Sequence, residues 1–103
     1  MLIRGFATTS PSRHPDFLKY GELCALYVDP RHWGRGLGVA LVTAARTNLV
    51  TLGFRTAILW VLVGNVRAER FYLNDNWMPD GTQRTNKVWG VEVEELLHRR
   101  ALT

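Results

Sequence analysis

The sequence predicts an α/β domain organised around a mixed β-sheet. Two apolar runs rich in β-branched and aromatic residues, 22–28 and 56–63, have the composition of buried strands. Between them, residues 35–52 carry apolar side chains at helical spacing, directly after a turn with three glycines at alternate positions. Strands that alternate with helices are typical of α/β sheets. Because the chain has 103 residues, 47% of them hydrophobic, we expect a single domain over 1–103 with a small core.

The rest of the chain continues this alternation and contains no internal repeat. Asn65 has the residue type of a helix N-cap, and a short helical pattern follows it until Trp77 and Pro79. Besides the two buried strands and the helix between them, the sequence predicts five further elements. These are a strand over 2–9, a loop over 10–21, a helix over 66–76, a turn at 78–82 and a closing strand over 88–100 interrupted at Gly90.

The chain is moderately basic, with 13 Lys and Arg against 9 Asp and Glu and a formal charge of +4. This charge favours an anionic partner, but it is compatible with a nucleic acid, a membrane surface, a phosphorylated small molecule or a plain solvated surface. No apolar run approaches the roughly 20 residues of a membrane span, and the first ten residues lack a signal-peptide pattern. We therefore expect a cytoplasmic protein with no membrane partner.

Neither an internal disulfide nor a metal centre is expected. Cys24 is the single cysteine, and we expect it to be a small buried residue within a strand. The three histidines, His14, His32 and His98, share no helix face and pair with no suitable Ser or Cys. We expect all three at the surface.

The glycines stand in the stretch YVDPRHWGRGLGVALV, at positions 34, 36 and 38. A glycine-rich turn between a strand and a helix lets backbone N–H groups converge on an anion, and the helix N-terminus adds about half a positive charge. The spacing is wrong for a dinucleotide fingerprint, because Val39 and Leu41 stand where its third glycine is required. The Gly-Lys-Ser/Thr of a P-loop is absent as well. The turn is suited to phosphate without matching either nucleotide motif.

This turn resembles the pyrophosphate loop of the GNAT family of acetyl-CoA-dependent N-acetyltransferases, whose motif is Gln/Arg-x-x-Gly-x-Gly/Ala between a strand and a helix. In this alignment Gly36 and Gly38 are the motif glycines, and Trp33 occupies the Gln/Arg position. A literal match that starts at Arg31 and uses Gly34 and Gly36 lies further back in the turn. We prefer the first alignment.

The resemblance continues through LWVLVGNVRAERFYLNDNW, where an Asn-capped helix ends in FYLNDNW, similar to the family pattern FYxxxGF. It spans roughly residues 2–98. It implies a GNAT-type mixed sheet with helices on both faces, lacking the first strand and two helices of the usual fold. The chain would then be a partial acetyltransferase domain, and its exposed sheet edge would favour a homo-oligomer.

The resemblance also implies acetyl-CoA as co-substrate and an unidentified amine as acceptor. The main-chain N–H groups from Gly34 to Gly38 would hold the pyrophosphate, and that of Leu26 or Tyr27 would stabilise the oxyanion of the reaction. The cofactor-binding positions implied for this chain are Leu26, Tyr27, Val28, Trp33, Gly34, Arg35, Gly36, Leu37, Gly38, Asn65 and Arg70.

Two further side chains stand at positions of catalytic residues in the family. Glu22 is implied as the base, which is useful because an amine with a pKa near 10 is mostly protonated at neutral pH. Tyr72 is implied as the acid that protonates the departing thiolate. Both residues also have a plainer interpretation, Glu22 as a polar residue of an edge strand and Tyr72 as a packed aromatic residue. The same holds for Asn65 among the cofactor positions, which can be a helix cap with no ligand contact.

Three functions are compatible with these patterns. The first is N-acetyl transfer by direct attack of the amine on acetyl-CoA. The second is a CoA-binding or interaction module of the same fold that performs no catalysis. The third is a small basic nucleic-acid-binding protein, which is disfavoured because the sequence has no recognition-helix pattern and no RNP-like aromatic motif.

Overall fold

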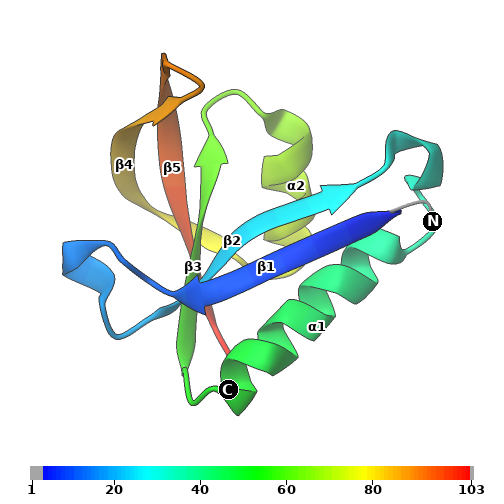
Figure 1. Ribbon diagram of the computed structural model, residues 1–103, viewed down its shortest axis with the longest axis horizontal. Helices are drawn as coiled ribbons and strands as arrows, with labels where there is room; N and C mark the ends of the chain where they lie inside the picture. Colours follow the sequence, from blue (N-terminus) through cyan, green and yellow to red (C-terminus); the bar gives the residue numbers. More distant parts are fainter. Residues whose placement is uncertain (1–3, 103) are drawn as a thin grey trace. The chain divides into compact units, whose positions relative to one another are not determined.

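The computed structural model describes residues 4–102, and over these residues the chain forms five strands and two α-helices (Figure 1). The elements are β1 (Gly5–Pro11), β2 (Gly21–Val28), α1 (Leu37–Thr51), β3 (Thr56–Leu62), α2 (Val66–Asn74), β4 (Met78–Val88) and β5 (Val91–Ala101), with short 3₁₀ turns at Pro15–Phe17 and Pro30–His32. The strands form one mixed sheet in the order β1-β2-β3-β5-β4. This confirms the predicted α/β class. The first two residues of the strand predicted over 2–9 lie outside the described residues.

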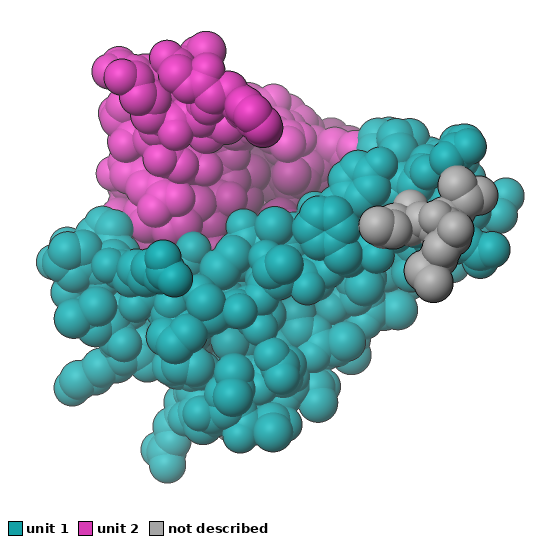
Figure 2. All heavy atoms as spheres, viewed as in Figure 1, with its two compact units in different colours: residues 1–57, 101–103 teal, residues 58–100 magenta. Residues whose placement is uncertain are grey.

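The chain divides into two compact units, coloured separately in Figure 2. Unit 1 comprises residues 1–57 and 101–103, and unit 2 comprises residues 58–100. The expectation of a single domain over 1–103 stays a prediction.

In unit 1, helix α1 covers one face of the antiparallel β1–β2 pair. A Cβ built on Gly5 would come within 3.0 Å of the Leu41 side chain, and one on Gly21 would come within 2.7 Å of Leu49, so both strands approach the helix closely. The Nδ2 of Asn48 donates to the Thr9 hydroxyl at 2.8 Å. Because side chains alternate along a strand, every second residue of this pair faces away from α1.

Helix α1 forms where its apolar spacing predicts. Val42, Ala45 and Leu49 recur on one face and are buried. The helix ends in a Schellman motif, in which the N–H of Phe54 donates to the Leu49 carbonyl at 3.1 Å across Gly53. Gly53, with φ of 96°, therefore occupies the left-handed position directly after the end of the helix.

The β1–β2 ladder contains a bulge that the sequence does not reveal. Thr8 pairs with Ala25 and Thr9 with Leu23, so Cys24 has no partner in β1. Cys24 is exposed, with its Sγ 3.1 Å from the Ser10 hydroxyl. The expectation of a buried Cys24 is therefore wrong, because Cys24 follows the buried Leu23 and faces the other side of the strand, where it is exposed.

In unit 2, strand β3 supplies the core that its continuous apolar run predicts. Ile58, Leu59 and Val61 are buried, as are Trp77 and Leu97. An apolar run without alternation is typical of a strand covered on both faces.

The C-terminal part of unit 2 differs from the sequence-based expectation, because it is a hairpin of two long strands. The turn predicted at 78–82 instead opens β4, whose register with β5 is irregular between Pro79 and Gln83. The true turn consists of Trp89 and Gly90, with φ of 53° and 81°. Two positive φ values in a two-residue hairpin loop are typical of a type I′ turn, where Asn-Gly is favoured. Because Trp89 takes the position where Asn is usual, the sequence does not predict this turn.

His98 on β5 is also placed differently from the expectation. It is only 2% exposed, and its Nδ1 has no hydrogen-bond partner among residues 4–102. The surface assignment of His98 is therefore wrong. Leu97 and His98 are adjacent, so they face opposite sides of β5, and both are buried because both faces of the strand are covered at this point.

The left-handed conformation of Trp89 leads to a stability prediction. Trp89 is 98% exposed, so its indole contributes almost no packing, while a bulky residue at positive φ is strained. We expect Trp89→Asn to raise the free energy of unfolding by about 0.5–1 kcal/mol, because Asn accepts this conformation more readily. Urea denaturation measures the change. Trp89→Ala is the control, since it removes the indole without gaining a left-handed preference. Equal stabilisation by both substitutions would show that the left-handed conformation is not the cause.

Candidate functional site

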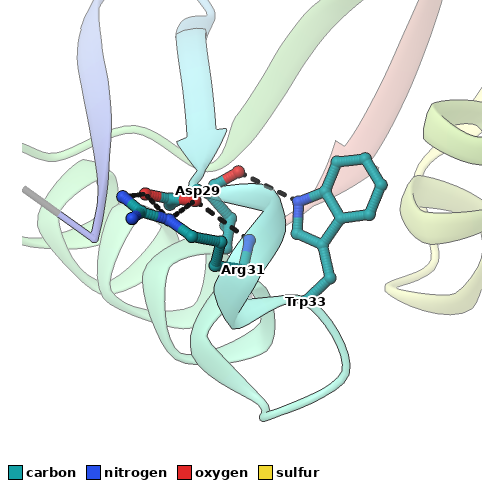
Figure 3. Close-up of polar contacts among 4 residues, drawn as sticks. Asp29, Arg31 and Trp33 are labelled. Atoms are coloured by element: carbon teal, nitrogen blue, oxygen red, sulfur yellow. Dashed lines mark hydrogen bonds and ion pairs between the residues drawn. The ribbon is translucent and has the colours of Figure 1, made fainter.

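The turn after β2 is closed by an ion pair within the turn itself. The Asp29 N–H donates to the Arg4 carbonyl at 2.7 Å, and the Asp29 Oδ1 accepts from the Arg31 N–H at 2.9 Å. The Arg31 guanidinium also donates to the Asp29 carboxylate, with Nη2 2.7 Å from Oδ2 (Figure 3). These hydrogen bonds from Arg31 lower the pKa of Asp29 from 3.8 to about 2. The Asp29 carboxylate is therefore ionised across the neutral range and fixes the start of the turn.

Trp33 ties the same turn to the end of β2. Its Nε1 donates to the Val28 carbonyl at 2.9 Å (Figure 3). Since an indole has a single N–H donor, this donor is directed to the protein and not to a ligand. Trp33 is 46% exposed, so part of the ring faces solvent beside the glycines. In the preferred alignment, Trp33 therefore anchors the turn at the position where the family motif has Gln or Arg.

Gly34 and Gly36 give the turn its shape. Both adopt the left-handed conformation, with φ of 78° and 79°, which costs glycine almost nothing and other residues more. A Cβ built on either residue would meet no atom within 4 Å, so open space lies beside the backbone at both positions. Gly36 is the N-cap of α1 and provides no side-chain cap. Gly38 lies in the first turn of the helix.

The first N–H groups of α1 have no acceptor in the part of the protein that the structure describes. The first α-helical bond runs from the Ala40 N–H to the Gly36 carbonyl, at 3.0 Å. The N–H groups of Leu37, Gly38 and Val39 precede it and point beyond the helix end. Uncapped N–H groups, the helix dipole and open space are features that suit an anion, and the N–H groups of Leu37, Gly38 and Val39 with the space beside Gly34 and Gly36 are called the cradle below.

The charge distribution favours an anion at this cradle. Unit 1 contains seven Lys and Arg against three Asp and Glu, whereas unit 2 contains six of each, so the whole formal charge of +4 belongs to the unit that carries the turn. Such an excess raises the local concentration of anionic ligands.

The face of β1–β2 opposite α1 carries Glu22 and Tyr27. Gly21 and Gly5 face the helix, and Gly5 pairs with Val28, so by alternation Glu22 and Tyr27 face away from it. Tyr27 pairs with Phe6, and their ring centroids are 5.6 Å apart. Leu26 and Val28 share the α1 face by the same alternation, so a part in ligand binding would fall to their main-chain groups.

The remaining candidate residues of unit 2 lie on or beside α2. Asn65 caps the helix, with its Oδ1 accepting from the Ala68 N–H at 3.2 Å, which confirms the capping role. Arg70 is exposed on the same helix. Tyr72 is partly buried near the helix end, where its ring contacts Phe71 and Trp77 edge to face. Burial raises the pKa of Tyr72 above its ordinary value of 10.0, so its hydroxyl stays protonated at neutral pH.

Two features of the site were missed by the sequence analysis. Asp-Pro indicates the turn at Asp29 but not the ion pair that Asp29 forms with Arg31. The bulge at Cys24 has no such signal, because no glycine marks it. Among residues 4–102, no group of three or more His, Cys, Asp or Glu side chains is arranged to hold a metal ion.

The sequence profile of the acetyltransferase (GNAT) family matches residues 3–74. The chain belongs to the GNAT family. A comparison with curated protein sequences gives no significant match. Within the described part of the chain, neither helix has the length and apolar character needed to cross a membrane.

Solved structures of GNAT acetyltransferases share the fold. An N-acetyltransferase from Staphylococcus aureus Mu50 superposes with a TM-score of 0.77 at 22% identity, covering 96% of this chain and 61% of that protein. A putative acetyltransferase from Salmonella typhimurium, solved with its cofactor acetyl-CoA, gives 0.79 at 19% identity and covers 99% and 60%. The ribosomal-protein-S18-alanine N-acetyltransferase of Escherichia coli gives 0.74 at 24% identity and covers 97% and 62%. The chain thus spans about three fifths of the length of these proteins.

The ion pair in the turn leads to a pH prediction. Because the pKa of Asp29 is lowered in the folded protein, its stabilising contribution is present above 3.8 and is lost as the pH falls through about 2. We expect Asp29→Asn to lower the free energy of unfolding near neutral pH, and the gap from the wild type to shrink over this acid range. Urea denaturation as a function of pH measures the gap. Asp16→Asn, at an exposed carboxylate, is the control, and a gap independent of pH would contradict the assignment.

Proposed function

We propose that this GNAT chain binds acetyl-CoA through the cradle at the start of α1 and transfers the acetyl group to an amine. The observation that carries the proposal is the set of three helix N–H groups, those of Leu37, Gly38 and Val39, without an acceptor among the described residues. The open space beside Gly34 and Gly36 suits a pyrophosphate, because a diphosphate lying against main-chain N–H groups leaves no room for a Cβ. The Salmonella typhimurium relative solved with acetyl-CoA supports the choice of ligand.

The proposed reaction is direct attack of a neutral amine on the acetyl carbonyl carbon, with formation of the C–N bond, breakage of the thioester C–S bond and protonation of the thiolate. Glu22 is proposed to take the proton from the amine, directly or through water. Tyr72 is proposed to give its proton to the thiolate, for which its raised pKa keeps it in the protonated form. The main-chain N–H of Leu26 or Tyr27 is proposed to stabilise the oxyanion.

The proposal also includes further cofactor contacts, a cellular location and self-association. Asn65 and Arg70 are proposed as further contacts of the cofactor, and Arg35 and Val28 as parts of the loop that holds it. We also propose a cytoplasmic location and self-association through an edge of the sheet, since β1 and β4 stand at its two ends. The acceptor is proposed only as an amine.

A second candidate is a CoA-binding module without catalysis. The chain shares about three fifths of the length of its structural neighbours, and a shared fold does not by itself carry over the activity of those whole proteins. Acetyl-CoA binding without CoA release, across a set of primary amines, would identify such a module.

Gly36→Val tests the cradle. A Cβ at Gly36 occupies the space proposed for the ligand, and we expect acetyl-CoA affinity to fall by at least about tenfold, since each hydrogen bond to a charged group contributes about 1.5–3 kcal/mol. Titration calorimetry with acetyl-CoA measures the affinity. Gly53→Val is the matched control, because Gly53 also has a positive φ of 96° and open space at its Cβ, but lies at the other end of α1.

The two glycine variants separate a binding effect from backbone strain. We expect both to lose similar amounts of stability and only Gly36→Val to lose affinity. Unchanged affinity in folded Gly36→Val would contradict the cradle, and equal losses of affinity in both variants would assign the effect to strain.

Tyr72→Phe tests the proposed acid. The substitution keeps the ring and removes the hydroxyl, so we expect acetyl-CoA affinity to stay close to the wild type and turnover to fall by about 10²-fold or more. CoA release, followed with a thiol reagent, measures turnover with an amine that the wild type acetylates. Tyr20→Phe, in the loop before β2, is the control. Wild-type turnover in Tyr72→Phe would show that Tyr72 only packs.

A further inference from the structure

Helix α2 ends in a hydrogen-bonded motif centred on Tyr72. The Trp77 N–H donates to the Tyr72 carbonyl at 2.9 Å, and the Asn76 N–H donates to the Leu73 carbonyl at 3.0 Å. Asn76 adopts the left-handed conformation, with φ of 66°. These bonds define a Schellman motif, which commonly brings together the side chains that correspond here to Tyr72 and Trp77. Their ring centroids are 6.4 Å apart with an interplanar angle of 72°.

Trp77 is itself held in place by a carboxylate. The residue is completely buried, and its Nε1 donates to the Asp75 Oδ2 at 2.9 Å. A buried indole N–H needs such an acceptor, because leaving it unpaired costs about 1–3 kcal/mol. Asp75 therefore fixes the plane of the indole against which Tyr72 packs.

Asp75 is anchored in turn by β5. The Arg100 Nε donates to the Asp75 carbonyl at 2.6 Å and lies 3.8 Å from its Oδ2. Arg100 thus contacts both the main chain and the carboxylate of the residue that ends the helix. The chain of contacts runs from the strand through Asp75 to the indole of Trp77, and from the indole to Tyr72.

The phenol of Tyr72 depends on this chain of contacts for its position. Within residues 4–102 no hydrogen bond is made by its hydroxyl, so packing and the helix end determine where the hydroxyl points. A proton donor must be held within hydrogen-bond reach of the atom that receives the proton, and a misplacement of about 1 Å can cost about 10²-fold in rate.

We propose that Asp75 and Trp77 are positioning residues that hold the Tyr72 hydroxyl in place for proton donation to the leaving thiolate. This inference rests on the proposed role of Tyr72 as the acid. It assigns a function to the Trp77 N–H that a phenylalanine at this position would not provide. The Asp75 carboxylate acts through Trp77 and does not touch the reacting atoms.

The titration of the Tyr72 phenol tests the proposal without a cofactor or an acceptor. Trp77→Phe keeps an aromatic ring and removes the N–H donor to Asp75. We expect the raised pKa of Tyr72 to fall toward its ordinary value of 10.0, because the phenol is no longer held in its buried position. Ultraviolet difference titration measures tyrosine ionisation, and Tyr72→Phe assigns the signal. Trp89→Phe, the same substitution at an exposed position, should leave the titration unchanged.

Substitutions of Asp75 keep the test decisive if Trp77→Phe does not fold. Asp75→Asn retains an oxygen that accepts from the Trp77 Nε1, so we expect the Tyr72 titration to stay close to the wild type. Asp75→Ala removes the acceptor and is expected to lower the pKa of Tyr72. Equal titrations in both variants, or in folded Trp77→Phe and the wild type, would overturn the proposal.

Turnover separates positioning from general destabilisation. We expect Trp77→Phe to lower kcat by about tenfold with little change in the KM for acetyl-CoA, and to have no further effect in a Tyr72→Phe background. Additive losses would overturn the positioning role while leaving Tyr72 as the acid. Wild-type turnover in Tyr72→Phe would instead remove the acid itself, so the two failures are distinguishable.

Discussion

The left-handed conformation of Gly36 is the constraint on which the candidate site depends. It lets the chain enter α1 without a side-chain cap, so the N–H groups of Leu37, Gly38 and Val39 keep no acceptor among the described residues. A serine or aspartate at this position would satisfy one of these donors and would favour an extended conformation. Gly36 therefore provides no stabilising cap at the helix start, and the N–H donors of the first turn remain available to an anion. The net positive charge of unit 1 acts in the same direction.

The turn before these glycines is held by contacts within the protein. Asp29 and Arg31 close its beginning, and the Trp33 indole binds the Val28 carbonyl. Both sets of contacts precede the open part of the turn. A loop that binds an anion through main-chain groups gains from such rigidity, because the cost of ordering the backbone is met during folding and not on binding. Trp33, which stands in place of the Gln or Arg of the family motif, fits this role because its single N–H donor holds the backbone of the turn.

The sequence predicted the elements whose signals are local and repeated. The apolar spacing of α1, the continuous run of β3 and the Asn65 cap each correspond to the observed element. The errors arose where a single residue departs from the usual type. Trp89 occupies a turn position that Asn normally takes, and Cys24 forms a bulge without a glycine. His98 is buried, although histidine has no strong preference for the interior and nothing in its spacing indicates burial. At the site, the turn glycines were recognisable from their spacing, whereas the contacts of Asp29, Trp33 and Asp75 depend on side-chain positions that no spacing encodes.

The main-chain N–H groups at the start of α1 are proposed to bind the pyrophosphate of acetyl-CoA. Titration of ¹⁵N-labelled protein with acetyl-CoA, followed by amide NMR, tests this binding at the atoms concerned. Hydrogen bonding to a phosphate moves an amide proton downfield. We expect the largest downfield shifts, saturating with the ligand, at the amides of Leu37, Gly38, Val39 and the glycines before them. Saturable binding that leaves these amides unmoved, or the absence of any binding, would show that the start of α1 does not hold the pyrophosphate.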